Sequence, residues 1–312
     1  MQDSPDIFDT DLSGLDWDAW CERANALAGD DGYAEPLGDA HAAVLIEREP
    51  KTLLVTFETH HRLSEISPKA QPLGWALTKA LGWSHLCLIS KRDTWFRDGM
   101  VYGYFDRLID DGFFDEFDEV IFYGAGACGY AAAAFSVASP GAKVVMLRPQ
   151  ATLDPRVTEW DDRYLRMRRT SFTNRYGYAP DMLDAASEAV LLYDPDIDLD
   201  AMHAALFTRS NVLKFRTRHL GYQSEKALLR MGVIFRLLAQ IRAGKLTPLS
   251  LAQLYRKRRD DTPYLFSVLQ RLMSEERDLL AMMHCRNAIA RRVGGPRFRK
   301  ALNMLRAKQD PQ

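Results

Sequence analysis

The chain has 312 residues, of which 47% are hydrophobic and 27% charged, proportions typical of a globular protein with an ordinary core. It contains no apolar run long enough to span a bilayer, and its acidic start lacks the basic-then-apolar pattern of a signal peptide, so we expect a cytoplasmic protein. The cysteines are far apart and form no C-x-x-C pair, so we expect no disulfide framework, no metal site and no cofactor; they are Cys21, Cys87, Cys128 and Cys285.

The net charge of −1 conceals a strong asymmetry along the chain. Residues 1–40 hold eleven acidic residues and one basic residue, whereas residues 242–312 hold sixteen Lys and Arg and six acidic residues. A basic end can contact nucleic acid. Because acids such as Glu275 and Glu276 interrupt this one, we expect a solvated helical face or a contact with the acidic N-terminal segment instead.

In chain order, three regions are predicted: a disordered acidic tail over residues 1–14, an α/β domain over 15–243 and a helical region over 244–312. The first helix is expected over Leu15–Ala28, where apolar residues recur at helical spacing and Gly29 follows as a stop signal. Short apolar strands then alternate with helices. Strands are predicted at 42–46, 53–57, 85–90, 120–123, 143–147, 189–193 and 211–215, and helices at 71–82 and 102–110.

This alternation predicts an α/β fold with one doubly wound, mostly parallel sheet covered on both faces. The strands at 42–46 and 53–57 are expected to pair as a hairpin or to be neighbours in the sheet. The loop after 53–57 carries His60 and His61, which are candidates for catalysis or metal binding. With no further His or acid at ligand spacing, a solvated loop is the simpler interpretation.

The wholly apolar run Val120–Tyr123 is typical of a strand in the middle of a parallel sheet. Six small residues follow, Gly124–Gly129, and then an alanine-rich helix. Gly124, Gly126 and Gly129 match the dinucleotide fingerprint G-x-G-x-x-G. That interpretation requires an acid at the end of the next strand, which instead ends at Arg148.

The alternative is a nucleophile elbow, G-x-S-x-G, in which small residues let a strand turn sharply into a helix. The segment YGAGACGYAAAAFSVASPGAKVVMLRPQATLDP resembles a bacterial branch of the α/β-hydrolase superfamily, whose elbow reads G-S-S-M-G-G-Y. The matching residues are Gly129, Tyr130, Ala131, Pro149, Gln150, Asp154 and Pro155. The resemblance implies an α/β-hydrolase type of sheet.

In this register Gly126 occupies the position of the nucleophilic serine and Cys128 the last small position. The resemblance places the triad histidine after the last strand, before a helix, and Tyr222 stands there. Two of the three triad positions are therefore altered. Groups that could act in their place are Cys128, His60, His219 and Asp196.

Residues 152–178 form an Arg-rich insertion that covers the pocket in the resembling family. Its arginines suit carboxylates, phosphates or sulfates, and the alternative is a charged lid surface; they are Arg163, Arg166, Arg168, Arg169 and Arg175. Backbone N–H groups at a helix N-terminus also favour anions. A site for a small anionic or sugar-containing ligand is therefore predicted at Gly124, Gly126, Ala127, Gly129, Arg166 and Arg169.

Beyond residue 244, four short amphipathic helices are predicted at 248–259, 263–273, 275–292 and 296–307. The last two resemble a tetratricopeptide-type hairpin, which needs neighbours to be stable, so a protein partner is one possibility.

Three functional hypotheses follow. The first is a catalytically altered hydrolase-like protein serving as a binding or accessory module, associated by resemblance with bacterial cell-surface glycans. The second is an enzyme with unorthodox site residues. The third is a dinucleotide-binding oxidoreductase or a sulfonucleotide reductase, although the S-G-G-x-D-S and E-C-G-x-H motifs of the latter are absent.

Overall fold

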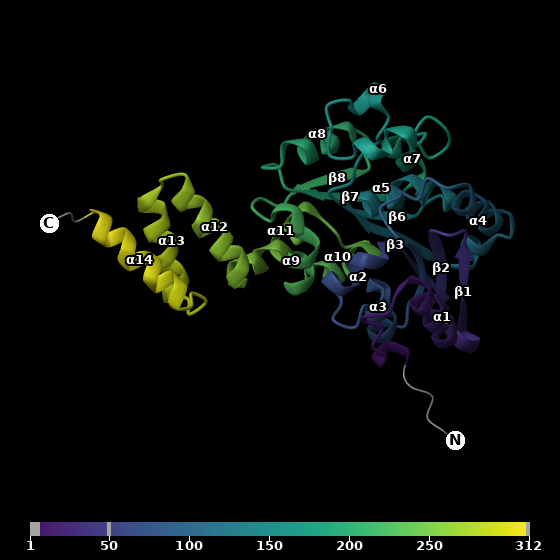
Figure 1. Cartoon of the computed structure of the whole chain (residues 1–312), viewed down its shortest axis with the longest axis horizontal. Coiled ribbons are helices and arrows are strands. Elements are labelled where there is room, and N and C mark those ends of the chain that lie inside the picture. The colour runs from purple at the N-terminus through teal and green to yellow at the C-terminus, as the bar shows by residue number, and fades with distance from the viewer. Residues whose placement is uncertain (1–6, 49–50, 310–312) are drawn as a thin grey trace, which may run out of the picture.

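The computed structural model describes residues 7–48 and 51–309 and contains one eight-stranded sheet with helices on both faces (Figure 1). The strands are β1 (Gly32–Leu37), β2 (His41–Ile46), β3 (Thr52–Thr59), β4 (Ser84–Ser90), β5 (Glu119–Ala125), β6 (Lys143–Leu147), β7 (Glu188–Tyr193) and β8 (Val212–Arg216). Their order is β1-β2-β4-β3-β5-β6-β7-β8. β2 is antiparallel to both neighbours and all later pairs are parallel.

This strand order, with an antiparallel β2 and the exchange of β3 and β4, is that of the α/β-hydrolase fold. The predicted fold class is therefore confirmed. β5 lies between β3 and β6, well inside the sheet, so the Gly124–Gly129 turn is at the carboxyl edge of its centre. In open α/β sheets this edge is where ligands bind.

Helices cover both faces of the sheet. The longer or better packed ones are α1 (Trp17–Ala28), α2 (His60–Ile66), α3 (Leu73–Leu81), α4 (Gly99–Asp110), α5 (Ala127–Phe135), α8 (Asp198–Leu206), α9 (Ser224–Arg230) and α10 (Val233–Arg242). Single turns lie at α6 (Pro155–Thr158) and α7 (Ala179–Met182).

Alternate residues of β3 point to opposite faces. Val55 and Phe57 join the apolar cluster with α4 and α5, whereas Leu54 joins the cluster with α3 and α10.

Two strand predictions need correction. The segment Gly32–Leu37 forms edge strand β1, which was not predicted because it is short, weakly apolar and contains Pro36. Proline lacks the N–H for a ladder bond and is tolerated at an edge. β2 and β3, expected to pair or be neighbours, are separated by β4.

The predicted disordered tail is also corrected for residues 7–14, whereas residues 1–6 lie outside the described residues. Leu12 is 1% exposed, and its N–H donates to the carbonyl of Lys69 at 2.9 Å. The Gln71 amide donates to the carbonyls of Phe8 and Thr10. This segment is therefore held against the start of α3.

The C-terminal region is wholly helical, as predicted, with α11 (Pro248–Tyr255), α12 (Thr262–Ser274), α13 (Asp278–Ala290) and α14 (Pro296–Gln309). α11 packs on the core of the sheet domain through Leu251 and Tyr255. α12, α13 and α14 share a separate apolar cluster and project away from the sheet (Figure 1). The boundary at residue 244 and the tetratricopeptide label stay predictions.

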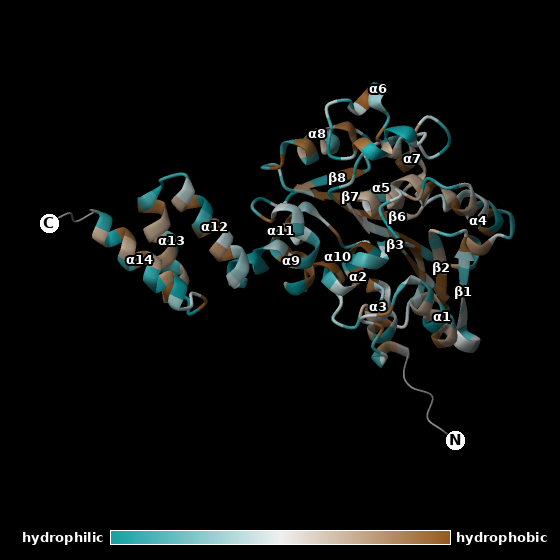
Figure 2. Ribbon diagram, in the orientation of Figure 1, coloured by the Kyte–Doolittle hydropathy of each residue, from teal (hydrophilic) through white to brown (hydrophobic). Residues whose placement is uncertain are grey.

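Figure 2 shows apolar colour concentrated in the strands and hydrophilic colour over much of α14. None of the helices in the described part of the chain is long and apolar enough to span a bilayer.

Candidate functional site

The turn from β5 into α5 has the backbone shape that a nucleophile elbow needs. Gly126 immediately precedes α5, with φ 63° and ψ −123°. A Cβ added at Gly124 would lie 2.1 Å from the carbonyl oxygen of Cys128, whereas one added at Gly126 would meet nothing within 4 Å. The sharp turn therefore requires a glycine two residues before Gly126. At Gly126 itself there is space for a side chain.

The residues that the resemblance places around such a turn can be located in the structure. Gly126 has no side chain, and Tyr222 lies in a short 3-10 turn before α9 and is 62% exposed. Asp194, the first of three acids after β7, is 1% exposed. One of its carboxylate oxygens accepts the N–H of Gly221 at 2.9 Å, and the other accepts the N–H of Asp196. Asp194 therefore fixes the backbone here.

Two of the predicted alternative groups, Asp196 and His219, do meet. His219 Nδ1 lies 2.8 Å from Asp196 Oδ2, and the guanidinium of Arg271 lies 2.7 Å from the same oxygen. Arg271 belongs to α12, so this pair joins the sheet domain to the C-terminal helices. Asp196 and Arg271 thus form an ion pair between the end of the sheet and α12.

The other two candidates lie in environments that do not favour catalysis. Burial raises the pKa of the Cys128 thiol to about 12, and its sulfur lies 3.4 Å from the Thr59 hydroxyl. Since the thiolate is the nucleophilic form, Cys128 is a poor nucleophile at neutral pH. His60 begins α2, and its ring contacts those of Trp17 and Trp20 at centroid distances of 5.8 Å.

The cavity beside the elbow is almost completely filled. It is lined by Phe57, Glu58, Thr59, Arg62, Ile66, Ala125, Cys128 and Glu225, and its volume is about 10 Å³. The carboxylate of Glu225 accepts the Tyr123 hydroxyl at 2.8 Å and lies 3.4 Å from Arg62. A cavity of this size holds at most about one water molecule.

The loop expected after β3, which was to carry His60 and His61, is instead the first turn of α2, because that helix begins directly at His60.

Below this cavity lies a buried polar cluster that the sequence analysis missed. Thr56 and Glu58 on β3, and His85 and Cys87 on β4, are all less than 6% exposed. The Thr56 hydroxyl lies 2.7 Å from Glu58 Oε1 and 2.9 Å from His85 Nε2, and Cys87 Sγ lies 3.8 Å from the same Glu58 oxygen. Burial raises the pKa of Glu58 to about 7 and lowers that of His85 to about 3.

The sequence does contain a sign of this cluster, because polar residues occur at alternate positions in two otherwise apolar strands. Thr56 and Glu58 share one face of β3, and His85 and Cys87 share the same face of β4. Only the parallel register of the two strands, which pairs Thr56 with Cys87, brings them together. Motif spacing along a single segment does not show it.

Two of the five arginines of the insertion, Arg163 and Arg175, bind carboxylates within the protein. Arg163 lies 2.8 Å from Asp161 and 2.6 Å from Asp200, both buried. Asp161 also accepts from His203 Nε2 at 2.9 Å. Burial alone would raise the pKa of Asp161, but the hydrogen bonds from His203 and Arg163 outweigh it and hold the pKa well below its usual range. This network fastens the insertion to α8.

Of the two arginines predicted to bind an anion, Arg166 has a side chain 78% exposed and lies 3.9 Å from Asp93. Arg169 is also exposed. Both are therefore accessible at the surface, and their role as anion ligands stays a prediction. Gly126 is not among the residues that line the cavity beside the elbow.

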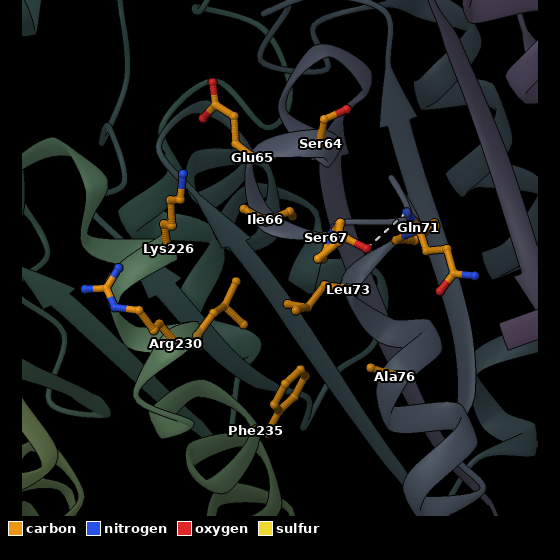
Figure 3. A pocket seen from close by; sticks show the side chains of 13 residues that line it. Ser64, Glu65, Ile66, Ser67, Gln71, Leu73, Ala76, Lys226, Arg230 and Phe235 are labelled. Carbon is orange, nitrogen blue, oxygen red and sulfur yellow. Dashed lines mark hydrogen bonds between the residues drawn. The ribbon is translucent and has the colours of Figure 1, made fainter. Parts of the chain in front are cut away.

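A larger groove lies between helices on the face opposite α5. Its volume is about 680 Å³, and α2 and α3 face α9 and α10 across it (Figure 3). Leu73 and Phe235 contribute apolar surface, while Glu65, Lys226 and Arg230 add charge. This groove has the size of a small-molecule site.

No protein-family model matches the chain, and no curated protein matches its sequence. Among solved structures, it is similar to a glycosylation-associated protein complex from Streptococcus agalactiae, with 14% identity, coverage of 67% of this chain and 46% of that chain, and a TM-score of 0.43. This chain therefore spans less than half of that relative's length.

The chain is also similar to the capsule O-acetyltransferase of Neisseria meningitidis serogroup A, with 10% identity, coverage of 67% of this chain and 96% of that chain, and a TM-score of 0.45. A third similarity is to an esterase from Pyrobaculum calidifontis, with 15% identity, coverage of 69% of this chain and 85% of that chain, and a TM-score of 0.43. The assignment of the α/β-hydrolase fold rests on the strand order described above.

The elbow geometry predicts unequal costs for two glycine substitutions. Gly124→Ala forces a Cβ against the Cys128 carbonyl and should lower the free energy of unfolding by more than about 3 kcal/mol. Gly126→Ala meets no atom but must adopt a positive φ, which costs about 1–2 kcal/mol. Urea denaturation of both variants measures the difference. Equal losses, or a greater loss for Gly126→Ala, would contradict the elbow described here.

Proposed function

We propose that this protein is a catalytically altered α/β-hydrolase-like protein that acts as a binding or accessory module. The observation that carries the proposal is Gly126, which keeps the backbone geometry of a nucleophile position but has no reactive atom. The exposed Tyr222, which stands where the resemblance places the triad histidine, supports the same conclusion. A serine hydrolase needs nucleophile and base within hydrogen-bond reach, and neither position supplies one.

The other hypotheses find less support. An enzyme with unorthodox groups would have to use Cys128, whose thiol is buried, or His219, whose ring lies beside Asp196 and Arg271. A dinucleotide-binding oxidoreductase would need an acid at the end of β6 to bind a ribose hydroxyl of the dinucleotide. Arg148 follows that strand, and its guanidinium donates to Ser224 at 2.9 Å.

The C-terminal helices offer the surface that best suits a protein partner. One face of α13 packs inside the bundle through Ala281, Met282 and Cys285. The other face exposes Leu279 and Met283, which are 67% and 63% accessible. A helix that is apolar on both faces is usually buried on both, and methionine suits adaptable binding surfaces. We therefore assign this exposed face to partner binding.

The charge of α14 indicates the chemistry of the partner. Its sequence, PRFRKALNMLRAKQ, has five basic residues and no acidic residue, and Met304 adds exposed apolar surface beside them. An acidic amphipathic helix would complement this combination, with its apolar side on α13 and its carboxylates toward α14. The proposal commits to a partner of that kind.

A small anionic or sugar-containing ligand is a second candidate, supported by the accessible Arg166 and Arg169 and by the groove with Lys226 and Arg230 at its rim. The resemblance found in the sequence adds cell-surface glycan systems as the setting. Calorimetric titration with sugar phosphates at low salt should show binding. If the insertion is the binding site, Arg166→Ala with Arg169→Ala should weaken sugar-phosphate binding. If the groove is the site, Lys226→Ala should weaken it instead. No heat in any titration would contradict this candidate.

Activated esters provide the test of altered catalysis. Wild-type protein should give no burst of p-nitrophenol from p-nitrophenyl acetate, because Gly126 cannot be acylated and Cys128 is protonated at neutral pH. Cys128→Ala should behave identically in stopped-flow absorbance. A stoichiometric burst that disappears in Cys128→Ala would show that the altered site is catalytic after all.

Partner binding is tested with a synthetic helical peptide that has leucines on one side and glutamates on the other. Wild-type protein should bind it in fluorescence anisotropy, more weakly at high salt. Leu279→Ser with Met283→Ser should weaken binding at least about tenfold, a loss of about 1.4 kcal/mol. The matched control, Met100→Ser with Ile109→Ser, removes exposed apolar side chains from α4 and should bind as wild type. Equal binding by both pairs, or none by wild type, would reject this surface.

A further inference from the structure

The buried cluster on β3 and β4 contains a set of metal-ligand atoms that no proposed function uses. A carboxylate oxygen of Glu58, a ring nitrogen of His85 and the sulfur of Cys87 all lie within 4.8 Å of one another. They come from the same face of two hydrogen-bonded strands. Strands hold side-chain direction firmly, so the three groups converge without help from a flexible loop.

From this convergence we propose that Glu58, His85 and Cys87 form a structural zinc site in the sheet domain. The donor set fits zinc, which binds Cys sulfur, His nitrogen and carboxylate oxygen in tetrahedral sites. The Thr56 hydroxyl contacts both Glu58 and His85, so it lies beside the position of the ion. Its oxygen or one water molecule would complete the fourth position.

Charge balance in the core supports the proposal. Glu58, His85 and Cys87 are between 0 and 5% exposed, and an uncompensated charge at such a position is costly. Zinc displaces the Cys87 proton to solvent, and one thiolate plus one carboxylate neutralise its two positive charges. The complex is therefore neutral overall and suits a low-dielectric interior.

The packing of His85 also suits an imidazole that serves as a ligand. A Cβ at Gly74 would lie 2.1 Å from the His85 ring, so only glycine at this point of α3 lets the ring occupy its position. His85 Nε2 lies 2.9 Å from the Thr56 hydroxyl, so this nitrogen faces the cluster and is the one that would bind zinc.

The test measures metal directly, because the site is too deeply buried for a reaction to report on it. Protein produced in zinc-supplemented medium should contain about one zinc ion per chain by mass spectrometry of the intact protein and by elemental analysis. Protein unfolded and refolded with Co²⁺ should show a thiolate-to-cobalt charge-transfer band in the near ultraviolet. Refolding with metal present removes the question of entry into a closed core.

Variants then assign the ligands. Cys87→Ser should abolish the charge-transfer band, and Glu58→Gln, which preserves side-chain size, should weaken zinc binding by at least about 100-fold. Cys285→Ser is the matched control, since it removes a buried thiol from the cluster of α12, α13 and α14. It should leave the band unchanged.

A folded wild-type protein that refolds with neither zinc nor a cobalt band would overturn the proposal. A band that persists in Cys87→Ser would overturn it as well, since the metal would then lie elsewhere. For Glu58→Gln, metal content and circular dichroism are measured on the same sample. A variant that is folded by circular dichroism but contains no zinc has lost a ligand, whereas an unfolded variant has lost its structure.

Discussion

The backbone at Gly126 is the constraint on which the arrangement of this protein depends. A positive φ at that residue turns central strand β5 into α5 within one peptide, and the turn closes because Gly124 lets the backbone of Cys128 approach it. Leu147 on the neighbouring strand β6 accepts the Gly126 N–H at 2.8 Å, so the turn is also tied into the sheet. A turn of this shape lets α5 pack closely on the sheet.

Around this turn, buried carboxylates bind other groups of the chain. Glu225 closes the space beside the elbow through Tyr123 and Arg62, and Asp194 fixes the Gly221 backbone. Each contact gives a buried carboxylate the partners it needs. Function has accordingly shifted outward in our account, to the projecting C-terminal helices and their exposed apolar and basic side chains. The Asp196 carboxylate and Arg271, 2.7 Å apart, link the sheet to these helices.

The sequence predicted strands and turns that depend only on residues close together in the chain. Continuous apolar runs predicted the central strands, and the six small residues ending at Gly129 predicted a sharp turn from β5 into α5. That this turn is a nucleophile elbow stays a prediction. Edge strand β1 was not predicted, because Pro36 and its polar neighbours give no strand signal. The cluster of Glu58 and Cys87 depends on which strands become neighbours, and the contact of Arg163 with Asp200 joins residues far apart in the chain. Contacts of this kind follow from topology and register, which a pattern along one segment does not contain.

The central claim is that the elbow is intact in shape but cannot support covalent catalysis. The most direct measurement is intact mass after incubation with an organic fluorophosphonate, made on the double variant Gly126→Ser with Tyr222→His. The variant restores both missing side chains, but the two Asp194 oxygens stay bound to the backbone N–H groups of Asp196 and Gly221, so the introduced histidine has no free carboxylate there to orient it. Our account predicts no adduct above the wild-type background. A stoichiometric phosphonyl adduct on the introduced serine would contradict it, because it would show a working site that lacks only two side chains.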